Sequence, residues 1–213
     1  IDGVMKVSHS FEHIDPKLVG NERIYITSDQ AGGALVVEKL SKMKPDIDKR
    51  DPIVSEILAV VKEMETQGYH FETAEGTFEL LASRKLGIFA DRFTVLGYRV
   101  IEDKQSNGLP VSEASVKIRV GSDISHHVAE GDGPVNALDA ALRKALVPYF
   151  EFMAGVRLDD FKVRVLGNKV GTDATVRVWA TFGDDEGQWN VAGVSTNIIE
   201  ASWLALLDGL NYK

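Results

Sequence analysis

Histidine has the widest chemical range of the side chains in this sequence, because a neutral imidazole can bind a metal ion or move a proton. The five histidines are His9, His13, His70, His126 and His127. None has the H-x-x-x-H or H-E-x-x-H spacing that places two imidazoles on one face of a helix. His126 and His127 adjoin in an alternating segment, where a strand would point them to opposite faces. We therefore predict no metal site.

Nucleophilic catalysis also lacks its usual residues. The chain has no cysteine, which excludes disulfides and thiolate metal sites, and it has no G-x-S-x-G motif. The carboxylates are numerous but scattered. Trp179, Trp189 and Trp203 fall at positions that favour packing over a stacking platform. We predict that this chain has no catalytic residues and no cofactor of its own.

Length and composition suit one domain or two small ones. The 213 residues carry a net charge of -8 and are 44% hydrophobic, which is enough for a buried core. This net negative charge argues against a surface that binds nucleic acid or an anionic membrane. No apolar run approaches the ~20 residues of a membrane span, so a cytoplasmic location is expected. Because the chain begins with Ile1, we expect it to be a piece of a longer protein.

Residues 1–92 predict a mostly helical segment. Apolar residues recur at helical spacing over about 30–43, 52–67 and 74–86. Asp51-Pro52 is typical of a helix start, with an acidic cap before a proline at the first helical position. Gly68 is typical of a helix end.

From Phe93 onward the pattern alternates, and it occurs twice. Tyr98-Arg99-Val100 lies 63 residues before Phe161-Lys162-Val163. Ala114 to Ile118 matches Ala174 to Val178 at an offset of 60. Different offsets predict hairpin loops that differ in length by three residues between the copies, as a duplicated unit allows.

The predicted fold class is α+β. A helical subdomain, residues 1–92, precedes a domain of two βββα repeats at about 93–155 and 156–213. Three strands and one helix scarcely form a core alone, so the two repeats should pack together, and pairing with a second chain is common for such units.

The turn Gly131-Asp132-Gly133-Pro134 is the most distinctive local feature. Its glycines allow close backbone approach, and the helix behind it presents free N–H groups that suit a carboxylate. The second repeat has Ser195-Thr196-Asn197 at this place. The alternative is ordinary helix-start chemistry, with Asn197 and Glu200 as a capping box. The local sequence leaves both interpretations open.

Two stretches resemble the 2-isopropylmalate synthase family, and in particular its citramalate synthase branch. Residues 12–21 (EHIDPKLVGN) are similar to the linker that follows the catalytic barrel, while 131–138 (GDGPVNAL) and 194–203 (VSTNIIEASW) resemble the C-terminal regulatory domain. The ending Gly209 to Lys213 looks like the citramalate branch. The resemblance covers essentially the whole chain.

The resemblance implies a parent acyltransferase that condenses acetyl-CoA with a 2-oxo acid, pyruvate in the citramalate branch, with a divalent metal in an N-terminal TIM barrel. This chain would be its dimerising regulatory part and inactive alone. It would form a homodimer and bind the end product isoleucine for feedback inhibition. The matching effector positions are Gly131, Gly133, Val135, Asn136, Asp173, Val176 and Val178.

Three alternatives differ from this expectation. Leucine as the effector would indicate the isopropylmalate branch. A structural dimerisation module that has lost its effector site is the second. A nucleic-acid module is the third, and the acidic charge and the lack of a basic, aromatic strand face count against it.

Overall fold

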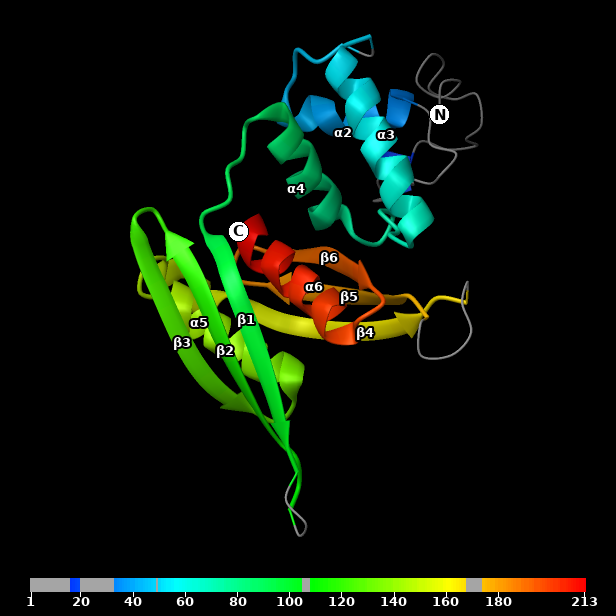
Figure 1. Ribbon diagram of the computed structural model, residues 1–213. Coiled ribbons are helices and arrows are strands. Elements are labelled where there is room, and N and C mark those ends of the chain that lie inside the picture. Colours follow the sequence, from blue (N-terminus) through cyan, green and yellow to red (C-terminus); the bar gives the residue numbers. More distant parts are fainter. Residues whose placement is uncertain (1–15, 20–32, 49, 105–107, 168–173) are drawn as a thin grey trace.

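The computed structural model describes residues 16–19, 33–48, 50–104, 108–167 and 174–213. Within these ranges, one short 3-10 helix and three α-helices precede two three-stranded antiparallel sheets, each followed by an α-helix (Figure 1). This arrangement confirms the predicted α+β class with a helical part and a duplicated βββα pattern. The first elements are η1 (Pro16–Val19), α2 (Gly33–Met43), α3 (Pro52–Gln67) and α4 (Glu75–Leu86).

Local cap chemistry defines α3, as the sequence predicts. The Asp51 side chain accepts a hydrogen bond from the backbone N–H of Ile53 at 3.1 Å, and Pro52 is the first helical residue. Gly68 ends the helix at φ 115, a left-handed conformation that glycine adopts readily. The helices bury a small core of their own, which includes Leu40 and Phe78.

The second part consists of two equivalent sheets. Sheet A has β1 (Thr94–Asp103), β2 (Val111–Val120) and β3 (Asp123–Gly131), followed by α5 (Pro134–Leu146) and η2 (Glu151–Gly155). Sheet B has β4 (Arg157–Val165), β5 (Val176–Gly183) and β6 (Gln188–Ser195), followed by α6 (Ile198–Tyr212).

Even an irregularity of the sheets is duplicated. The ladder shifts between Val95 and Gly97 in β1, and again between Leu158 and Asp160 in β4. These bulges occupy equivalent positions 63 residues apart, which is the offset predicted for these strands. The two sheets therefore derive from one repeated unit.

The strand register corrects the predicted match between β2 and β5. Val116 pairs with Tyr98, and Ala180 pairs with Phe161, so Ala180 is the structural equivalent of Val116. The sequence comparison placed Val176 there, four residues earlier. The second hairpin turn also has the same length in both repeats: Val120 pairs with Asp123, and Asp184 N–H donates to the Gly187 carbonyl at 2.9 Å. The predicted three-residue differences between the loops were wrong.

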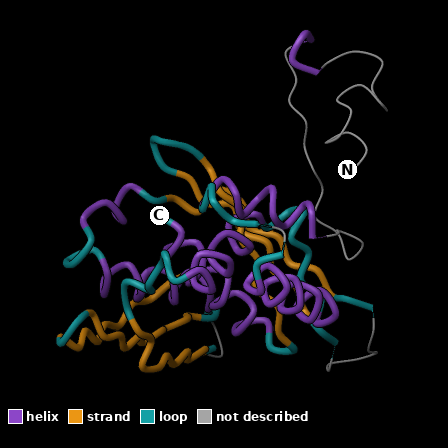
Figure 2. Tube along the Cα trace, turned by 90° about the horizontal axis from the view of Figure 1, so that it is seen from above, coloured by secondary structure: helices purple, strands orange, loops and turns teal. Residues whose placement is uncertain are grey.

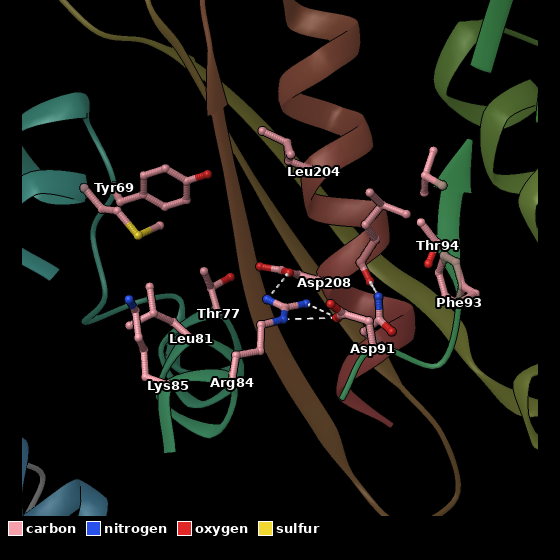
Figure 3. A pocket seen from close by; sticks show the side chains of 14 residues that line it. Tyr69, Thr77, Leu81, Arg84, Lys85, Asp91, Phe93, Thr94, Leu204 and Asp208 are labelled. Atoms are coloured by element: carbon pink, nitrogen blue, oxygen red, sulfur yellow. Dashed lines mark hydrogen bonds and ion pairs between the residues drawn. The ribbon is translucent and has the colours of Figure 1, made fainter. Parts of the chain in front are cut away.

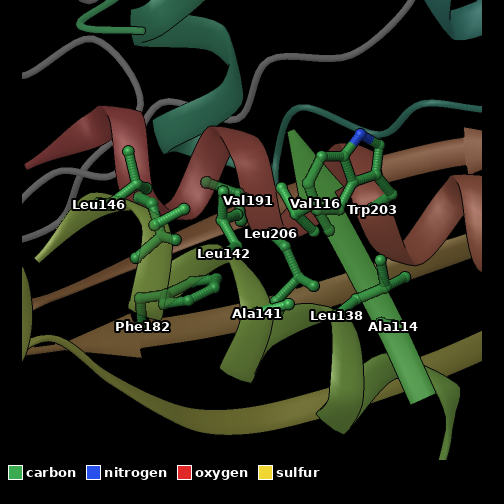
Figure 4. Close-up of a cluster of buried hydrophobic side chains, with 14 of the residues drawn as sticks. Ala114, Val116, Leu138, Ala141, Leu142, Leu146, Phe182, Val191, Trp203 and Leu206 are labelled. Carbon is green, nitrogen blue, oxygen red and sulfur yellow. The ribbon is translucent and has the colours of Figure 1, made fainter. Parts of the chain in front are cut away.

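One core joins the two repeats. α5 covers sheet A, α6 covers sheet B, and the two helices contact each other. In the view from above, the strands form two groups with helices between them (Figure 2). Figure 4 shows Leu142 of α5, Phe182 of β5 and Leu206 of α6 in this cluster, all fully buried. The repeats thus bury their apolar faces against each other, as predicted.

The helical part packs against sheet B. Thr77 of α4 lies at the free edge of β6, where its hydroxyl accepts from the Ala192 N–H at 2.9 Å and donates to the Ala192 carbonyl at 3.5 Å. The Tyr212 hydroxyl of α6 donates to Glu79 of α4 at 2.5 Å. Because α4 satisfies backbone groups of this edge strand, β6 is protected from pairing with another chain.

Candidate functional site

The glycine turn between β3 and α5 is closely packed. A Cβ atom on Gly131 would lie 2.5 Å from the backbone nitrogen of Ala137 and 2.5 Å from the Asn136 side-chain oxygen. That oxygen accepts from the Asp132 N–H at 3.3 Å. Only glycine fits at position 131, because the turn folds directly over the first turn of α5.

The start of α5 has no side-chain cap. Gly133 is the N-cap residue with an extended backbone, and it has no side chain that could accept from the first N–H groups. At the equivalent start of α6, the Asn197 side chain accepts from Ile199 N–H at 2.8 Å and Glu200 N–H at 3.3 Å. The N-terminal donors of α5 therefore lack the side-chain acceptor that α6 has.

The predicted capping box of α6 is only half formed. Asn197 caps the helix, but the Glu200 carboxylate accepts from the Tyr98 hydroxyl at 2.5 Å, and the Asn197 N–H donates to the Ser195 hydroxyl at 3.1 Å. A contact between the two repeats has taken the place of the local bond, so this detail of the prediction was wrong.

An open depression of about 720 Å³ lies beside the glycine turn. Its lining residues are Leu109, Pro110, Val111, Glu130, Gly131 and Asp132. The side chains of Leu109 and Val111 are 88% and 50% exposed. The depression thus combines an apolar wall with two carboxylates, next to an uncapped helix start. The apolar wall suits an apolar ligand side chain, and the two carboxylates suit an ammonium group. The uncapped helix start suits a ligand carboxylate.

The predicted effector residues fall into two groups. Gly131, Gly133 and Asn136 lie in the turn and at the start of α5, and Val135 is half-buried against the main core. Val176 and Val178 lie on the face of sheet B that packs into the main core, and Val178 is fully buried. Asp173 lies outside the described residues. Among the described cavities, none is lined by residues of both groups.

A second cavity, of about 730 Å³, lies between α4, the start of β1 and α6 (Figure 3). Arg84 contacts Asp91 at 2.7 Å and Asp208 at 3.5 Å across it. Burial raises the pKa of the Asp208 carboxyl to about 6, and Arg84 opposes this shift only in part. The sequence gives no signal for this cavity, because its charged residues come from three separate elements.

The remaining chemical candidates of the sequence form no further site. His126 is exposed and His127 half-buried at successive positions of β3, as expected of opposite faces. Among residues 33–48, 50–104, 108–167 and 174–213, no group of three or more His, Asp or Glu side chains could hold a metal ion. His9 and His13 lie outside the described residues.

The tryptophans serve packing. Trp189 and Trp203 are buried in the main core, and Trp203 lies 4.9 Å from the Tyr98 ring between centroids. Trp179 is half-buried on β5, with the Arg177 guanidinium 4.9 Å from its ring centroid. None of the three forms an open stacking surface with another, which agrees with the prediction.

These features define a duplicated βββα module with a helical extension. Residues 72–213 match the family model described as the LeuA allosteric (dimerisation) domain. The chain therefore belongs to this family. No helix within the described ranges is long and apolar enough to cross a membrane.

Similar proteins carry a consistent name. The (R)-citramalate synthase of Geobacter sulfurreducens is 44% identical over 214 residues, covering 100% of this chain and 40% of the relative. The (R)-citramalate synthase of Aquifex aeolicus is 42% identical over 211 residues, covering 99% and 40%. That of Synechocystis sp. is 39% identical over 216 residues, covering 100% and 40%. The chain spans about 40% of the length of these relatives.

Proposed function

We propose that this chain is the regulatory and dimerising part of a citramalate synthase-type acyltransferase, and that it binds isoleucine as a feedback inhibitor. The parent reaction condenses acetyl-CoA with pyruvate, and its divalent metal belongs to a catalytic barrel outside this chain. Membership of the allosteric (dimerisation) domain family supports the regulatory and dimerising role. The names of the relatives support the citramalate synthase type of the parent.

The observation that carries the ligand proposal is the uncapped start of α5 beside the depression at Gly131. The ligand carboxylate accepts from the first N–H groups of α5, which the helix dipole favours. The ammonium group lies near Asp132 and Glu130, and the hydrocarbon side chain packs on Leu109 and Val111. Val176 and Val178 lie on sheet B and do not line this depression, so they take no part in the proposed site.

The amino acid acts as an inhibitor if it binds one arrangement of the parent enzyme better than another. A ligand shifts a conformational equilibrium only by its difference in affinity between the two states. The helical part connects the effector domain to the preceding barrel in the chain order, so it is the segment that relays the shift.

Calorimetric titration with isoleucine tests the site. Replacing Asp132→Asn removes a charge next to the ligand ammonium, and Asn136→Ala removes the side chain that accepts from the turn. Each variant should weaken isoleucine binding at least about tenfold, which corresponds to ~1.4 kcal/mol. The matched control is Asp185→Asn, on the exposed hairpin turn between β5 and β6.

The other outcomes have definite meanings. Tighter binding of leucine than of isoleucine would indicate a leucine-regulated isopropylmalate synthase part. Equal binding by wild type and both turn variants would place the effector elsewhere. If no branched-chain amino acid binds, the chain is a structural dimerisation module.

A further inference from the structure

The outer face of sheet A, which turns away from α5, carries its charges in two separate rows. This face consists of alternate residues of each strand, beginning with Val111 on β2 and Ile124 on β3. Lys117 lies directly opposite His126, and Glu113 lies directly opposite Glu130. The basic row and the acidic row are separated along the strands by the pair Ser115 and Val128.

This charge pattern costs stability in a single chain. Like charges directly opposite each other on neighbouring strands are destabilising, and Glu113 and Glu130 form such a pair. Within the part of the chain that the structure describes, none of Glu113, Lys117 or Glu130 makes an ion pair. A partner surface with the opposite charge order would relieve the repulsion.

Apolar side chains lie between and beyond the charged rows. Val128 is 46% exposed, Val111 50% and Ile124 54%. In Figure 1 the strands of sheet A lie in front of α5, so this face is turned to the viewer. These three apolar side chains are spread along one exposed face, and a partner that covers the charged rows would bury them as well.

The equivalent face of sheet B is partly covered by the same chain. Arg177, the counterpart of Glu113, donates to the Gly68 carbonyl at the end of α3. Gly68 also lies against the side chains of Leu166 and Val194. The helical part therefore covers the β6 side of the outer face of sheet B, where Ala192 is buried, while no described element covers the outer face of sheet A.

We propose that a second copy of this chain covers the outer face of sheet A, related by a two-fold axis that passes near Ser115 and runs across the strands. This inference rests on the proposed dimerising function and names the surface that performs it. This axis places β2 over the partner's β2, with the two strands running in opposite directions. Lys117 then meets the partner's Glu113, and His126 meets the partner's Glu130.

Charge argues against a two-fold axis that runs along the strands. Such an axis would place Lys117 over its own copy and Glu113 over its own copy, and like charges brought together in an interface cost several kcal/mol. Under the proposed axis, the row of Arg99, Ser115 and Val128 meets its own copy, and Arg99 is the one charged residue in that row. Arg99 lies on the edge strand β1, from which its long side chain can extend into water.

Charge reversal tests the surface. The symmetric interface uses the contact between Lys117 and the partner's Glu113 twice, so a single reversal creates two repulsive contacts. In sedimentation equilibrium at low salt, Lys117→Glu and Glu113→Lys should each raise the dimer dissociation constant at least about tenfold. The double variant carrying both reversals should return to within about threefold of wild type, because the contacts reform with exchanged signs.

The matched control is Arg164→Glu, an exposed residue of β4 that should leave dimerisation unchanged. Circular dichroism confirms that each variant folds. If the wild type is dimeric and both single variants dimerise equally well, the proposed surface is wrong while the dimerising function stands. If the double variant stays as weak as the singles, the proposed pairing is also overturned. A wild type that is monomeric at about 100 μM, far above a micromolar dissociation constant, overturns the dimerising function itself.

Discussion

The Tyr98 hydroxyl on β1 donates to the Glu200 carboxylate at the start of α6, with 2.5 Å between the oxygens. This bond joins the first strand of one repeat to the helix of the other. Burial and the neighbouring Glu200 raise the pKa of Tyr98 to about 12, which keeps the hydroxyl protonated as a donor. The contact therefore fixes how the two repeats sit together.

Replacing Tyr98→Phe should destabilise the domain. It removes one hydrogen bond to a charged group, typically worth about 1.5–3 kcal/mol, while the ring keeps its contact with Trp203. Urea unfolding measures the loss. The matched control is Tyr149→Phe, since no bond of the Tyr149 hydroxyl is found among the described residues and its side chain is 39% exposed. Equal stability of the two variants would show that the Glu200 contact contributes nothing.

Replacing Thr77→Val should loosen the junction between α4 and sheet B. The change keeps the side-chain shape but leaves the buried Ala192 N–H without its acceptor, at a cost of about 1–3 kcal/mol. Hydrogen exchange of the Ala192 amide should become faster. Thr66→Val, on the exposed side of α3, is the control. Unchanged exchange at Ala192 would contradict the role assigned to Thr77.

Replacing Gly193→Ala should disrupt the contact between β6 and α6. A Cβ at this position would lie 2.0 Å from the Ala201 carbonyl oxygen, and a backbone atom cannot move aside as a side chain can. We expect the free energy of unfolding, measured by thermal unfolding, to fall by about 1–3 kcal/mol. Gly155→Ala, where a Cβ meets nothing within 4 Å, should be nearly neutral. Similar stability of both variants would contradict the close packing.

Asp208 should make the domain less stable as the pH rises. Its folded pKa of about 6 lies above the ordinary value of 3.8, so the folded state binds the proton more tightly than the unfolded state does. This group's contribution is therefore full below about pH 4 and is lost as the pH rises through 6, by roughly 3 kcal/mol. The groups that face it are Arg84 on α4, Asp91 before β1 and Tyr69 between α3 and α4.

The test is Asp208→Asn, which imitates the protonated carboxyl. Its melting temperature should exceed that of wild type at pH 7.5, and the difference should vanish near pH 4. Asp185→Asn, which is fully exposed, should show no such pH dependence. A variant that melts below wild type at pH 7.5 would mean that the Arg84 contact outweighs the cost of burial.

Local chemistry made part of the fold predictable. Asp51, Pro52 and Gly68 define α3 through bonds within a few residues, and the sequence alone indicates them. The match of β2 with β5 was not predictable to the residue, because alternation has a period of two. A shift of four residues keeps every side chain on its face, so only the pairing of Val116 and Ala180 with their neighbours fixes the register.

The parts of the site formed by neighbouring residues in the sequence were predictable. The parts formed by strand pairing were not. The glycine turn at Gly131 follows from its sequence, but the wall formed by Leu109 and Val111 depends on how β2 pairs with β3. The sequence alone could not show that Glu200 bonds to Tyr98 and does not complete a capping box, because Tyr98 lies in the other repeat.

Thermal unfolding of this chain with L-isoleucine, L-leucine and L-valine tests the proposed function most directly. A ligand at about 100 times its dissociation constant adds roughly 2.7 kcal/mol to the stability of the folded state. We predict that isoleucine raises the melting temperature and that Asp132→Asn reduces the rise to about half or less, while leucine and valine have smaller effects. If none of the three raises it, the chain alone does not bind the effector, and the role proposed for the Gly131 turn is wrong.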